Sequence, residues 1–345
     1  IKADPLASHE KGTGLVMMCS MGDQTDIRFF REKNITPKIA INVDNTMNDH
    51  AGFLKGLTVK AARETVVQEL EKRGLIVKKE KIMHRTPMCE RSKTPIEFIV
   101  MKELYLKQEE FKADLRKMAH DIMFFEDKSR QILLDWIDAI SIDWPISRRR
   151  YYGTEIPLWY CKKCSATIVP PKGKYVRPWK EKPPVKKCEC GSSDLVGEQR
   201  IFDTWFDSSN TPLYILKHGT PFFDKNYPCS LRPQGKEIIR TWLYYTVLKG
   251  YHILGKKPFQ DAWVHYHVLD DHGKKMSKSL GNTLDPHDIL NRYGAEPFRL
   301  WCAIEGNITK GDISAAFERI EGAGKTITKL WNVCRFIDSF KHVEK

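Results

Sequence analysis

The stretch Lys274–Asn282 constrains the chain most, because it holds three lysines, two serines and a glycine and cannot form an ordinary helix face. The lysines would repel one another on a helix, and the small residues would bury little apolar surface. Such a stretch suits a loop that closes over a polyanion, and a triphosphate is the first candidate, since lysine pairs strongly with phosphate oxygens. A solvated basic loop is the alternative, but the specific order of residue types favours function.

Residues Lys275–Ser279 read Lys-Met-Ser-Lys-Ser, which resembles the signature loop of class I aminoacyl-tRNA synthetases. In that family the loop holds the ATP phosphates while an amino acid attacks the α-phosphate. The resemblance implies catalytic roles for Lys275 and Lys278, whose charges would stabilise the negative charge that grows on the departing pyrophosphate. It also implies ATP contacts by Met276 and Ser277, with Mg²⁺ as the companion ion of ATP.

The composition of the chain limits its class. Its 345 residues, 41% of them hydrophobic, leave room for two domains with real cores. A net charge of +13 suits a polyanionic partner such as RNA without identifying one. No apolar run is long enough to cross a membrane and no signal peptide opens the chain, so we expect no membrane partner and a cytoplasmic location. The first residue, Ile1, stands inside what reads as a strand, and we expect a fragment of a longer protein.

Four of the nine cysteines form two close pairs, Cys161 with Cys164 and Cys188 with Cys190. Two thiol pairs on turn-type segments are the usual arrangement for tetrahedral Zn²⁺, and the neighbouring lysines would favour the thiolates. Two disulfides are the competing interpretation, which suits an oxidising compartment better. Four sulfur ligands leave no open coordination position, so the pattern predicts a structural zinc.

Two further segments resemble ATP-binding parts of the family. Gly235 and Glu237 fit a Gly-x-Glu pattern at a strand end, where the carboxylate binds the ribose hydroxyls of ATP. Helix capping is the structural alternative for Glu237, and we expect a long helix to run from here to about Leu254. Trp263–Asp270 reads as a buried strand leading to the lysine loop, and we assign His267 on it to ATP binding, although packing is the commoner fate of such histidines.

The amino-acid pocket is predicted from Ile201–Ser209, which at first reads as an aromatic core strand. The segment resembles the valyl members of the family, and we assign Trp205 and Asp207 to the pocket, with the rigid indole as a wall against larger side chains. Trp144–Gly153 resembles a Trp-x-Ile-Ser-Arg segment of the family. The resemblance places its arginines near tRNA or nucleotide phosphate and its aromatic rings beside the amino-acid site.

Thr13, Asp23 and Asp26 form the candidate editing site. The spacing of the two aspartates alone favours helix capping. Together with the glycines around Thr13, however, the pair resembles the hydrolytic editing insertion of the valyl, isoleucyl and leucyl enzymes. There the second aspartate binds the α-amino group of a misattached amino acid, a role that the resemblance gives to Asp26.

Cys89 is expected to be a buried thiol, because Ser92 stands where many relatives carry a second zinc-binding cysteine.

Local patterns predict further elements. Thr58 and Gly74 mark the two ends of a helix over residues 59–73, and Asp285 marks the start of another. Apolar spacings predict helices over 114–123, 129–140 and 314–340. Strands are predicted for Leu15–Cys19, Pro37–Val43 and Leu75–Val77.

The resemblance covers nearly the whole chain and implies an α/β fold: the second half of a Rossmann-like class I core with a zinc insert, preceded by part of an α+β or β-barrel editing domain. The expected segments are 1–100, the C-terminal part of the editing (connective peptide) domain; 101–160, linker helices returning to the core; 161–200, the zinc insert; 201–290, the second half of the core with the lysine loop; and 291–345, stem-contact helices leading to an anticodon-binding domain outside the chain.

The implied function is ATP-dependent attachment of an amino acid to its tRNA through an adenylate, with hydrolytic editing of mischarged tRNA. Archaeal-type valyl enzymes are the best match and isoleucyl enzymes the runner-up. Valine and isoleucine differ by one methylene, worth about 1–3 kcal/mol, which is why editing accompanies synthesis. A zinc-containing RNA-binding module without chemistry is the alternative from another class. The family's His-x-Gly-His signature occurs nowhere in the sequence, so the chain alone is expected to be nearly inactive.

Overall fold

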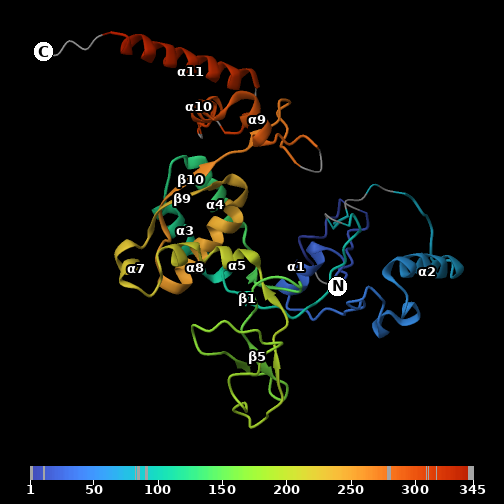
Figure 1. Cartoon of the computed structure of the whole chain (residues 1–345). Coiled ribbons are helices and arrows are strands. Elements are labelled where there is room, and N and C mark those ends of the chain that lie inside the picture. Colours follow the sequence, from blue (N-terminus) through green and yellow to red (C-terminus); the bar gives the residue numbers. More distant parts are fainter. Residues whose placement is uncertain are drawn as a thin grey trace. The chain divides into compact units, whose positions relative to one another are not determined.

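The computed structural model describes residues 3–10, 12–81, 83, 86–89, 92–277, 281–307, 309, 311–315 and 317–340. The chain divides into two compact units, Ile1–Lys102 and Glu103–Lys345, and each is described by itself (Figure 1). Among the described residues, every helix is too short or too polar to pass through a lipid bilayer.

The described part of the first unit is built from short helices. They are α1 (Gln24–Glu32), the 3-10 helix η1 (Asp49–Leu54) and α2 (Val59–Lys72). The Thr58 hydroxyl accepts the Ala61 N–H at 3.3 Å at the start of α2. Gly74 follows the helix with a φ of +66°, which an L side chain rarely adopts. The predicted start and stop of this helix are therefore confirmed.

The prediction of three strands in the first unit is wrong. Within its described residues, Leu15–Cys19, Pro37–Val43 and Leu75–Val77 form no strand, and an isolated bridge between Ile41 and Met47 is the nearest approach to one. Leu15 is 70% exposed. Apolar alternation favours a strand only where a partner strand satisfies its backbone groups, and these segments have none among the described residues. The prediction of a buried thiol is also wrong, because Cys89 is half-buried.

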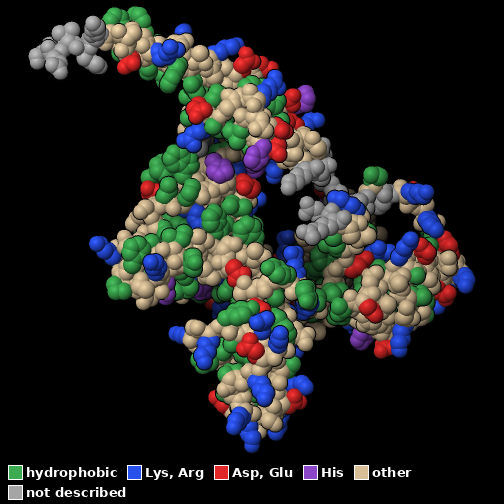
Figure 2. Space-filling view, in the orientation of Figure 1, with side chains coloured by type: hydrophobic (Ala, Val, Ile, Leu, Met, Phe, Trp, Pro, Cys, Tyr) green, Lys and Arg blue, Asp and Glu red, His purple; other side chains and the backbone are tan. Residues whose placement is uncertain are grey.

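The cysteine-bearing insert belongs to the second unit and contains a small antiparallel sheet. Its order is β6 (Thr167–Ile168), β5 (Trp159–Cys161) and β7 (Leu195–Gly197). Figure 2 shows Lys and Arg side chains scattered over this part of the surface, at the bottom of the view. Gly197 lies so close to the backbone of Pro178 that a Cβ would not fit. Because glycine has no side chain, the loop that carries Pro178 can pack onto β7.

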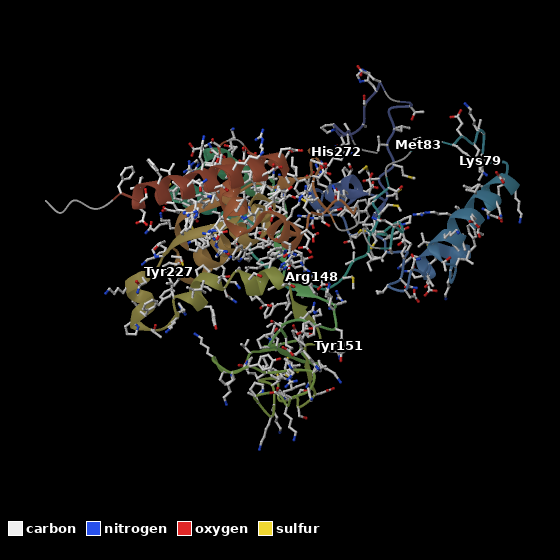
Figure 3. All side chains as sticks on the ribbon, turned by 45° about the horizontal axis from the view of Figure 1, so that its top comes forward. Lys79, Met83, Arg148, Tyr151, Tyr227 and His272 are labelled. Atoms are coloured by element: carbon white, nitrogen blue, oxygen red, sulfur yellow. The ribbon has the colours of Figure 1, made fainter. Side chains whose placement is uncertain are left out.

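Two short strand pairs lie outside the insert, and one of them joins residues that precede it to residues that follow it. β4 (Ser147–Arg148) pairs with β8 (Ile201–Phe202), and β1 (Tyr105–Leu106) pairs with β3 (Trp144–Pro145), both antiparallel. Figure 3 labels Arg148 on β4 and, beyond it, Tyr151, whose side chain is fully exposed.

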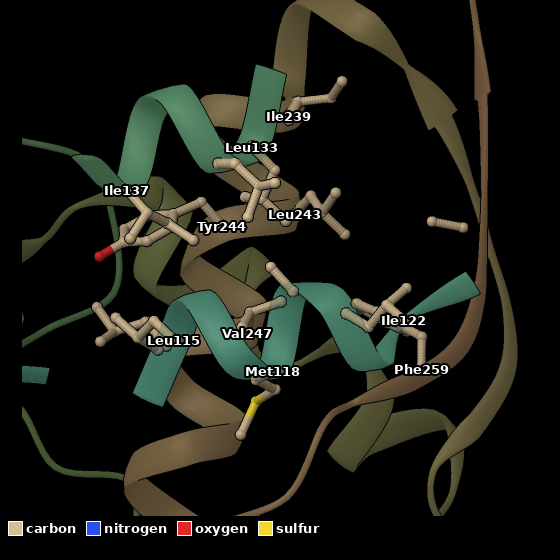
Figure 4. Close-up of a cluster of buried hydrophobic side chains, with 14 of the residues drawn as sticks. Leu115, Met118, Ile122, Leu133, Ile137, Ile239, Leu243, Tyr244, Val247 and Phe259 are labelled. Atoms are coloured by element: carbon tan, nitrogen blue, oxygen red, sulfur yellow. The ribbon is translucent and has the colours of Figure 1, made fainter. Parts of the chain in front are cut away.

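A parallel sheet forms the centre of the second unit. Its order is β2 (Met123–Phe124), β10 (Phe259–His265) and β9 (Cys229–Gly235). The helices α3 (Lys112–Asp121), α4 (Asp127–Ala139) and α8 (Tyr244–Leu254) pack with it. Their apolar side chains meet in one cluster (Figure 4), which includes Leu115, Met118, Ile122, Leu133, Ile137, Leu243, Tyr244, Val247 and Phe259. α3 and α4 confirm the helices predicted for 114–123 and 129–140, with starts two residues earlier.

Three predicted elements change conformation along their length. Ile201–Ser209 is not one strand, because β8 ends at Phe202 and helix α5 (Thr204–Ser208) follows. Trp263–Asp270 is divided between β10 and a separate strand, β11 (Val268–Leu269). The helix expected after Gly235 begins as a 3-10 turn, η3 (Lys236–Ile238), and a π-helical turn, η4 (Ile239–Leu243), before α8 ends at Leu254 as predicted.

The last part of the unit is helical, with α9 (Pro286–Tyr293), α10 (Ala295–Glu305) and α11 (Phe317–Asp338). Asp285 caps α9 and Pro286 is its first residue, as predicted. Between α10 and α11, β12 (Ile313–Ser314) pairs in parallel with β11. Smaller elements elsewhere are η2 (Glu109–Phe111), α6 (Thr211–Ile215) and α7 (Pro221–Asn226).

Candidate functional site

The carboxyl ends of β9 and β10 lie side by side, with Gly235 opposite His265 in the register of the sheet. Ligands of open α/β sheets bind outside these ends of the strands. The carboxylate of Glu237 folds into the space that a Cβ on Gly235 would occupy. The structure therefore brings together Gly235, Glu237 and His267, three of the residues predicted to bind a nucleotide.

His267 lies between the two strand ends. Its Nε2 is 3.3 Å from Glu237 Oε2, a distance typical of an ion pair. The same buried nitrogen has no aligned hydrogen-bond partner among the described residues, so the approach is a close polar contact without the geometry of a hydrogen bond. The Glu237 side chain is 45% exposed, which leaves its oxygens accessible to a ligand.

Asp312 joins the same cluster, although the sequence reasoning missed it. Its two carboxylate oxygens accept from Lys236 Nζ at 2.6 and 2.7 Å, and Oδ1 also accepts from the backbone N–H of His267 at 2.9 Å. Burial would raise the pKa of Asp312, but Lys236 and the backbone bond outweigh it and hold this pKa below its ordinary value. Asp312 follows Lys236 by 76 residues, a contact that no local pattern signals.

Asp270 and Asn282 close the base of the lysine loop. Asp270 accepts the backbone N–H groups of His272 at 3.0 Å and Lys274 at 2.7 Å, and the side-chain amide of Asn282 at 2.8 Å. These bonds, that of Asn282 first, lower the pKa of Asp270. Asn282 Oδ1 in turn accepts the Ser277 N–H at 2.9 Å. The entry and exit of the loop are thus fixed to each other.

The predicted loop residues are placed only in part. Lys275 bridges to Leu269 through its backbone and exposes its side chain. The Met276 sulfur accepts the Leu284 N–H at 3.3 Å, which holds this half-buried side chain. Lys278 lies outside the described residues, as do the two residues that follow it.

Trp205 and Asp207 lie on α5, which Asp203 positions. Asp203 is 8% exposed, and its carboxylate accepts from Trp205 N–H at 3.1 Å and from Trp144 Nε1 at 3.3 Å. It also forms an ion pair with Arg148. Arg148 is therefore engaged by the protein itself, and the phosphate contact predicted for the arginines of this segment stays a prediction.

Lys249 of α8 supports the same region. No sequence pattern indicated this role, because a helical lysine usually faces solvent. Its Nζ donates to the Phe206 carbonyl at 2.5 Å and to Asn210 Oδ1 at 3.0 Å. The ammonium also lies 3.5 Å from the centre of the Phe206 ring. Burial lowers the pKa of Lys249 to about 8.

The four paired cysteines converge, with 3.6 Å between the sulfurs of Cys161 and Cys190 and between those of Cys164 and Cys188. All four sulfurs lie within 4.8 Å of one another. Tetrahedral zinc with sulfurs at about 2.3 Å would separate them by about 3.8 Å, so the donor set fits this ion. Backbone N–H groups, that of Cys164 first, lower the pKa of Cys161 to about 6 and favour its thiolate. All four cysteines are free thiols, so the competing disulfides are not formed.

Asp23 and Asp26, in the first unit, form the capping box of α1. Asp23 Oδ1 accepts the N–H groups of Thr25 at 2.7 Å and Asp26 at 2.9 Å. The Asp26 carboxylate in turn accepts the Asp23 N–H at 3.1 Å and the Cys19 N–H at 2.9 Å. The Thr13 hydroxyl accepts the Leu15 N–H at 3.3 Å. The capping that spacing favoured is present, and the editing role of these residues stays a prediction.

Residues 46–314 match the family described as tRNA synthetases class I (I, L, M and V). Among curated relatives, Valine--tRNA ligase of Aeropyrum pernix is 45% identical over 99% of this chain and 42% of the relative. Valine--tRNA ligase of Nanoarchaeum equitans is 43% identical over 98% of this chain and 45% of the relative. The chain thus spans less than half the length of these relatives. A solved structure of Mycobacterium tuberculosis methionyl-tRNA synthetase in complex with methionyl-adenylate is 16% identical, with a TM-score of 0.49. The match covers 86% of this chain and 53% of that one.

Proposed function

The chain belongs to the class I tRNA synthetases of the I, L, M and V group, and we propose that the protein containing it attaches valine to its tRNA. The identities of 45% and 43% to two proteins named Valine--tRNA ligase support valine over the other amino acids of the group. Because the chain spans 42% and 45% of those relatives, this activity is proposed for the whole protein. Its substrates are ATP with Mg²⁺, valine and tRNA.

The observation that carries the proposal is the cluster at the carboxyl ends of β9 and β10. An exposed carboxylate at Glu237 can accept hydrogen bonds from the ribose hydroxyls of ATP. Gly235 leaves room for this carboxylate against the strand end. His267 adds a polar ring beside them. This is the edge of a parallel sheet at which nucleotides bind.

The lysine loop supplies the cations for adenylate formation. The valine carboxylate attacks the α-phosphate and pyrophosphate departs, so negative charge grows on the phosphoryl oxygens and the leaving group. Lys275 and Lys278 stabilise that charge, while Met276 and Ser277 complete the ATP contacts. The bonds between Asp270 and Asn282 support this role, because they fix the base of the loop. Cations placed beforehand act without reorganisation during the reaction.

The amino-acid pocket is proposed beside α5. Trp205 packs partly buried against the main core cluster, so its indole is held as a rigid wall. Asp207 lies on the same short helix, which Asp203 and Lys249 hold from two sides. A rigid wall rejects larger side chains, but one methylene is worth only about 1–3 kcal/mol.

Editing and the zinc insert complete the proposal. Asp26 receives one backbone N–H on each oxygen, and a carboxylate has about four acceptor positions, so room remains for the α-amino group of a misattached amino acid. Asp23 and Thr13 would border that site within the editing portion, residues 1–100. Residues 161–200 form a structural zinc insert between the linker helices, 101–160, and the second half of the core, 201–290. Residues 291–345 would contact the tRNA stem.

The test is amino-acid-dependent exchange of pyrophosphate into ATP by the longest natural polypeptide that contains this chain. We expect valine to exceed isoleucine by about 100-fold in catalytic efficiency. A higher catalytic efficiency with isoleucine would assign the protein to the isoleucyl enzymes instead. Absence of exchange with every amino acid would contradict a synthetase and favour a non-catalytic, zinc-containing RNA-binding module.

A further inference from the structure

Asp312 lies on the segment between α10 and β12, yet it bonds to residues that follow both central strands of the sheet. Lys236 follows β9 and His267 follows β10, and the Asp312 carboxylate accepts from Lys236 Nζ at 2.6 Å and from the His267 N–H at 2.9 Å. We propose that Asp312 is a positioning residue of the nucleotide site, which holds the Lys236 ammonium away from the Glu237 carboxylate so that this carboxylate can bind the ribose of ATP. This inference rests on the proposed function.

The backbone fixes Asp312 in this place. Ile313 donates its N–H to the His267 carbonyl at 3.0 Å, and Ala315 donates to the Leu269 carbonyl at 2.9 Å. These bonds belong to the ladder of β11 and β12, which directly follows Asp312. The Asp312 side chain is 29% exposed, so its contacts with the strand ends are partly shielded from water.

Asp312 is needed because of the position of Lys236. It is adjacent in sequence to Glu237, and its side chain is 25% exposed. Without Asp312, the Lys236 ammonium would be drawn to Glu237, the other carboxylate of this cluster, and would compete there with ribose hydroxyls. With Asp312 in place, both carboxylate oxygens hold the ammonium at 2.6 and 2.7 Å, and a charge-assisted pair of this kind is stronger than a neutral hydrogen bond.

The experiment compares dissociation constants for ATP and 2′,3′-dideoxy-ATP in the longest natural polypeptide that contains the chain. The unchanged protein is expected to prefer ATP by about tenfold, the effect of hydrogen bonds to a charged group. Asp312→Asn is expected to reduce the preference to about twofold or less, while Asp288→Asn, at an exposed carboxylate of α9, keeps it. A purely structural role would weaken both nucleotides equally and leave their ratio unchanged.

A second variant tests the role of the ammonium. Adding Lys236→Met to Asp312→Asn removes the competing charge and is expected to restore the preference for ATP. Lys236→Met alone is expected to keep that preference, so its loss in this variant would overturn the inference even if Asp312→Asn does not fold. An unchanged ratio in Asp312→Asn, no recovery in the double variant, or loss of the preference in Lys236→Met would overturn the inference.

The outcome is separable from that of the proposed function. A protein that loses the ATP preference through Asp312→Asn but never exchanges pyrophosphate with valine would overturn the proposed function and uphold this inference. Exchange with valine together with an unaltered nucleotide ratio would overturn the inference alone.

Discussion

The two units differ in how much of a core their described residues build. In the first unit, burial among those residues is confined to small positions such as Val59 and Ala62 on α2. The second unit fully buries large side chains, among them Trp144, Tyr244 and Phe259. The difference teaches that an apolar pattern becomes a strand only beside a partner: β10 has β2 and β9, whereas Leu15–Cys19 has no such neighbour among the described residues.

The cysteine insert lies in the second unit, but like the first unit it consists mostly of loops around a few short elements. Its four converging sulfurs take the place of a large apolar core. The comparison therefore predicts three kinds of stability within one chain: from metal in the insert, from packing around the parallel sheet, and from local caps in the first unit.

Loss of the metal should have the largest effect. Chelation or Cys164→Ser is expected to disorder the insert, because zinc bound by such ligands contributes about 10 kcal/mol to folding in small zinc domains. Metal analysis should find one zinc per chain before the change and almost none after it. Cys334→Ser, at an exposed cysteine of α11, is the control and should leave zinc bound. If Cys164→Ser left the zinc content unchanged, the result would contradict a zinc site at the four cysteines.

Core truncation should come next. Leu133 of α4 is fully buried in the core cluster of the second unit, so Leu133→Ala is expected to cost about 2–5 kcal/mol of unfolding free energy. Leu75 in the first unit is 64% exposed, and Leu75→Ala should change stability by about 0.5 kcal/mol or less. Denaturant unfolding of each variant measures both values. Equal losses at the two positions would remove the contrast between the units.

A buried carboxylate beside the insert should give a smaller, pH-dependent effect. Burial would raise the pKa of Glu198, but Arg200 and the Tyr160 hydroxyl outweigh it and lower this pKa to about 2. Because the folded pKa is lowered, the stability that Glu198 contributes is complete above the ordinary value of about 4.5 and is lost as pH falls toward 2.

Glu198→Gln is therefore expected to cost about 1–3 kcal/mol at neutral pH, where the charged hydrogen bonds are formed. The difference between variant and unchanged protein should shrink as pH falls below about 4.5. Unfolding free energies measured from pH 7 downward test this, with Glu189→Gln, at an exposed position of the insert, as the matched control. A difference independent of pH would show that the charge of Glu198 is not responsible.

The smallest effect should arise in the first unit. Thr58→Ala removes the side-chain acceptor of the Ala61 N–H and is expected to destabilise α2 by about 1 kcal/mol. Hydrogen exchange of the α2 amides measures the change. Thr58→Ser keeps an acceptor and should restore protection; protection that is the same in the alanine and serine variants would argue against the cap.

Sequence reasoning succeeded where the chemistry is local. Thr58 and Gly74 mark the ends of α2, and Asp285 the start of α9, because caps act within one helical turn. The spacing of the paired cysteines predicted that their four sulfurs converge, since each pair lies on one turn. Gly235 and Glu237 lie together, as two residues at one strand end do in any fold, and their role in ATP binding stays a prediction.

It failed where a partner is distant in sequence. Asp312 meets Lys236 across 76 residues, and Arg148 meets Asp203 across 55, so neither pair leaves a pattern that one segment can show. Ile201–Ser209 was read as one strand because its aromatic residues suit a strand, whereas Asp203 caps a helix within it. Tertiary contacts decided the first two cases, and in the third the local cap at Asp203 outweighed the strand propensity of the aromatic residues.

The most direct measurement concerns the lysine loop. We expect Lys278→Met, in the longest natural polypeptide that contains the chain, to slow single-turnover formation of valyl-adenylate by about 10²–10³-fold, the usual cost of removing one group that stabilises transition-state charge. Lys274→Met, which removes an exposed lysine outside the signature, should retain the normal rate. Adenylate formed at the normal rate without Lys278 would contradict the account.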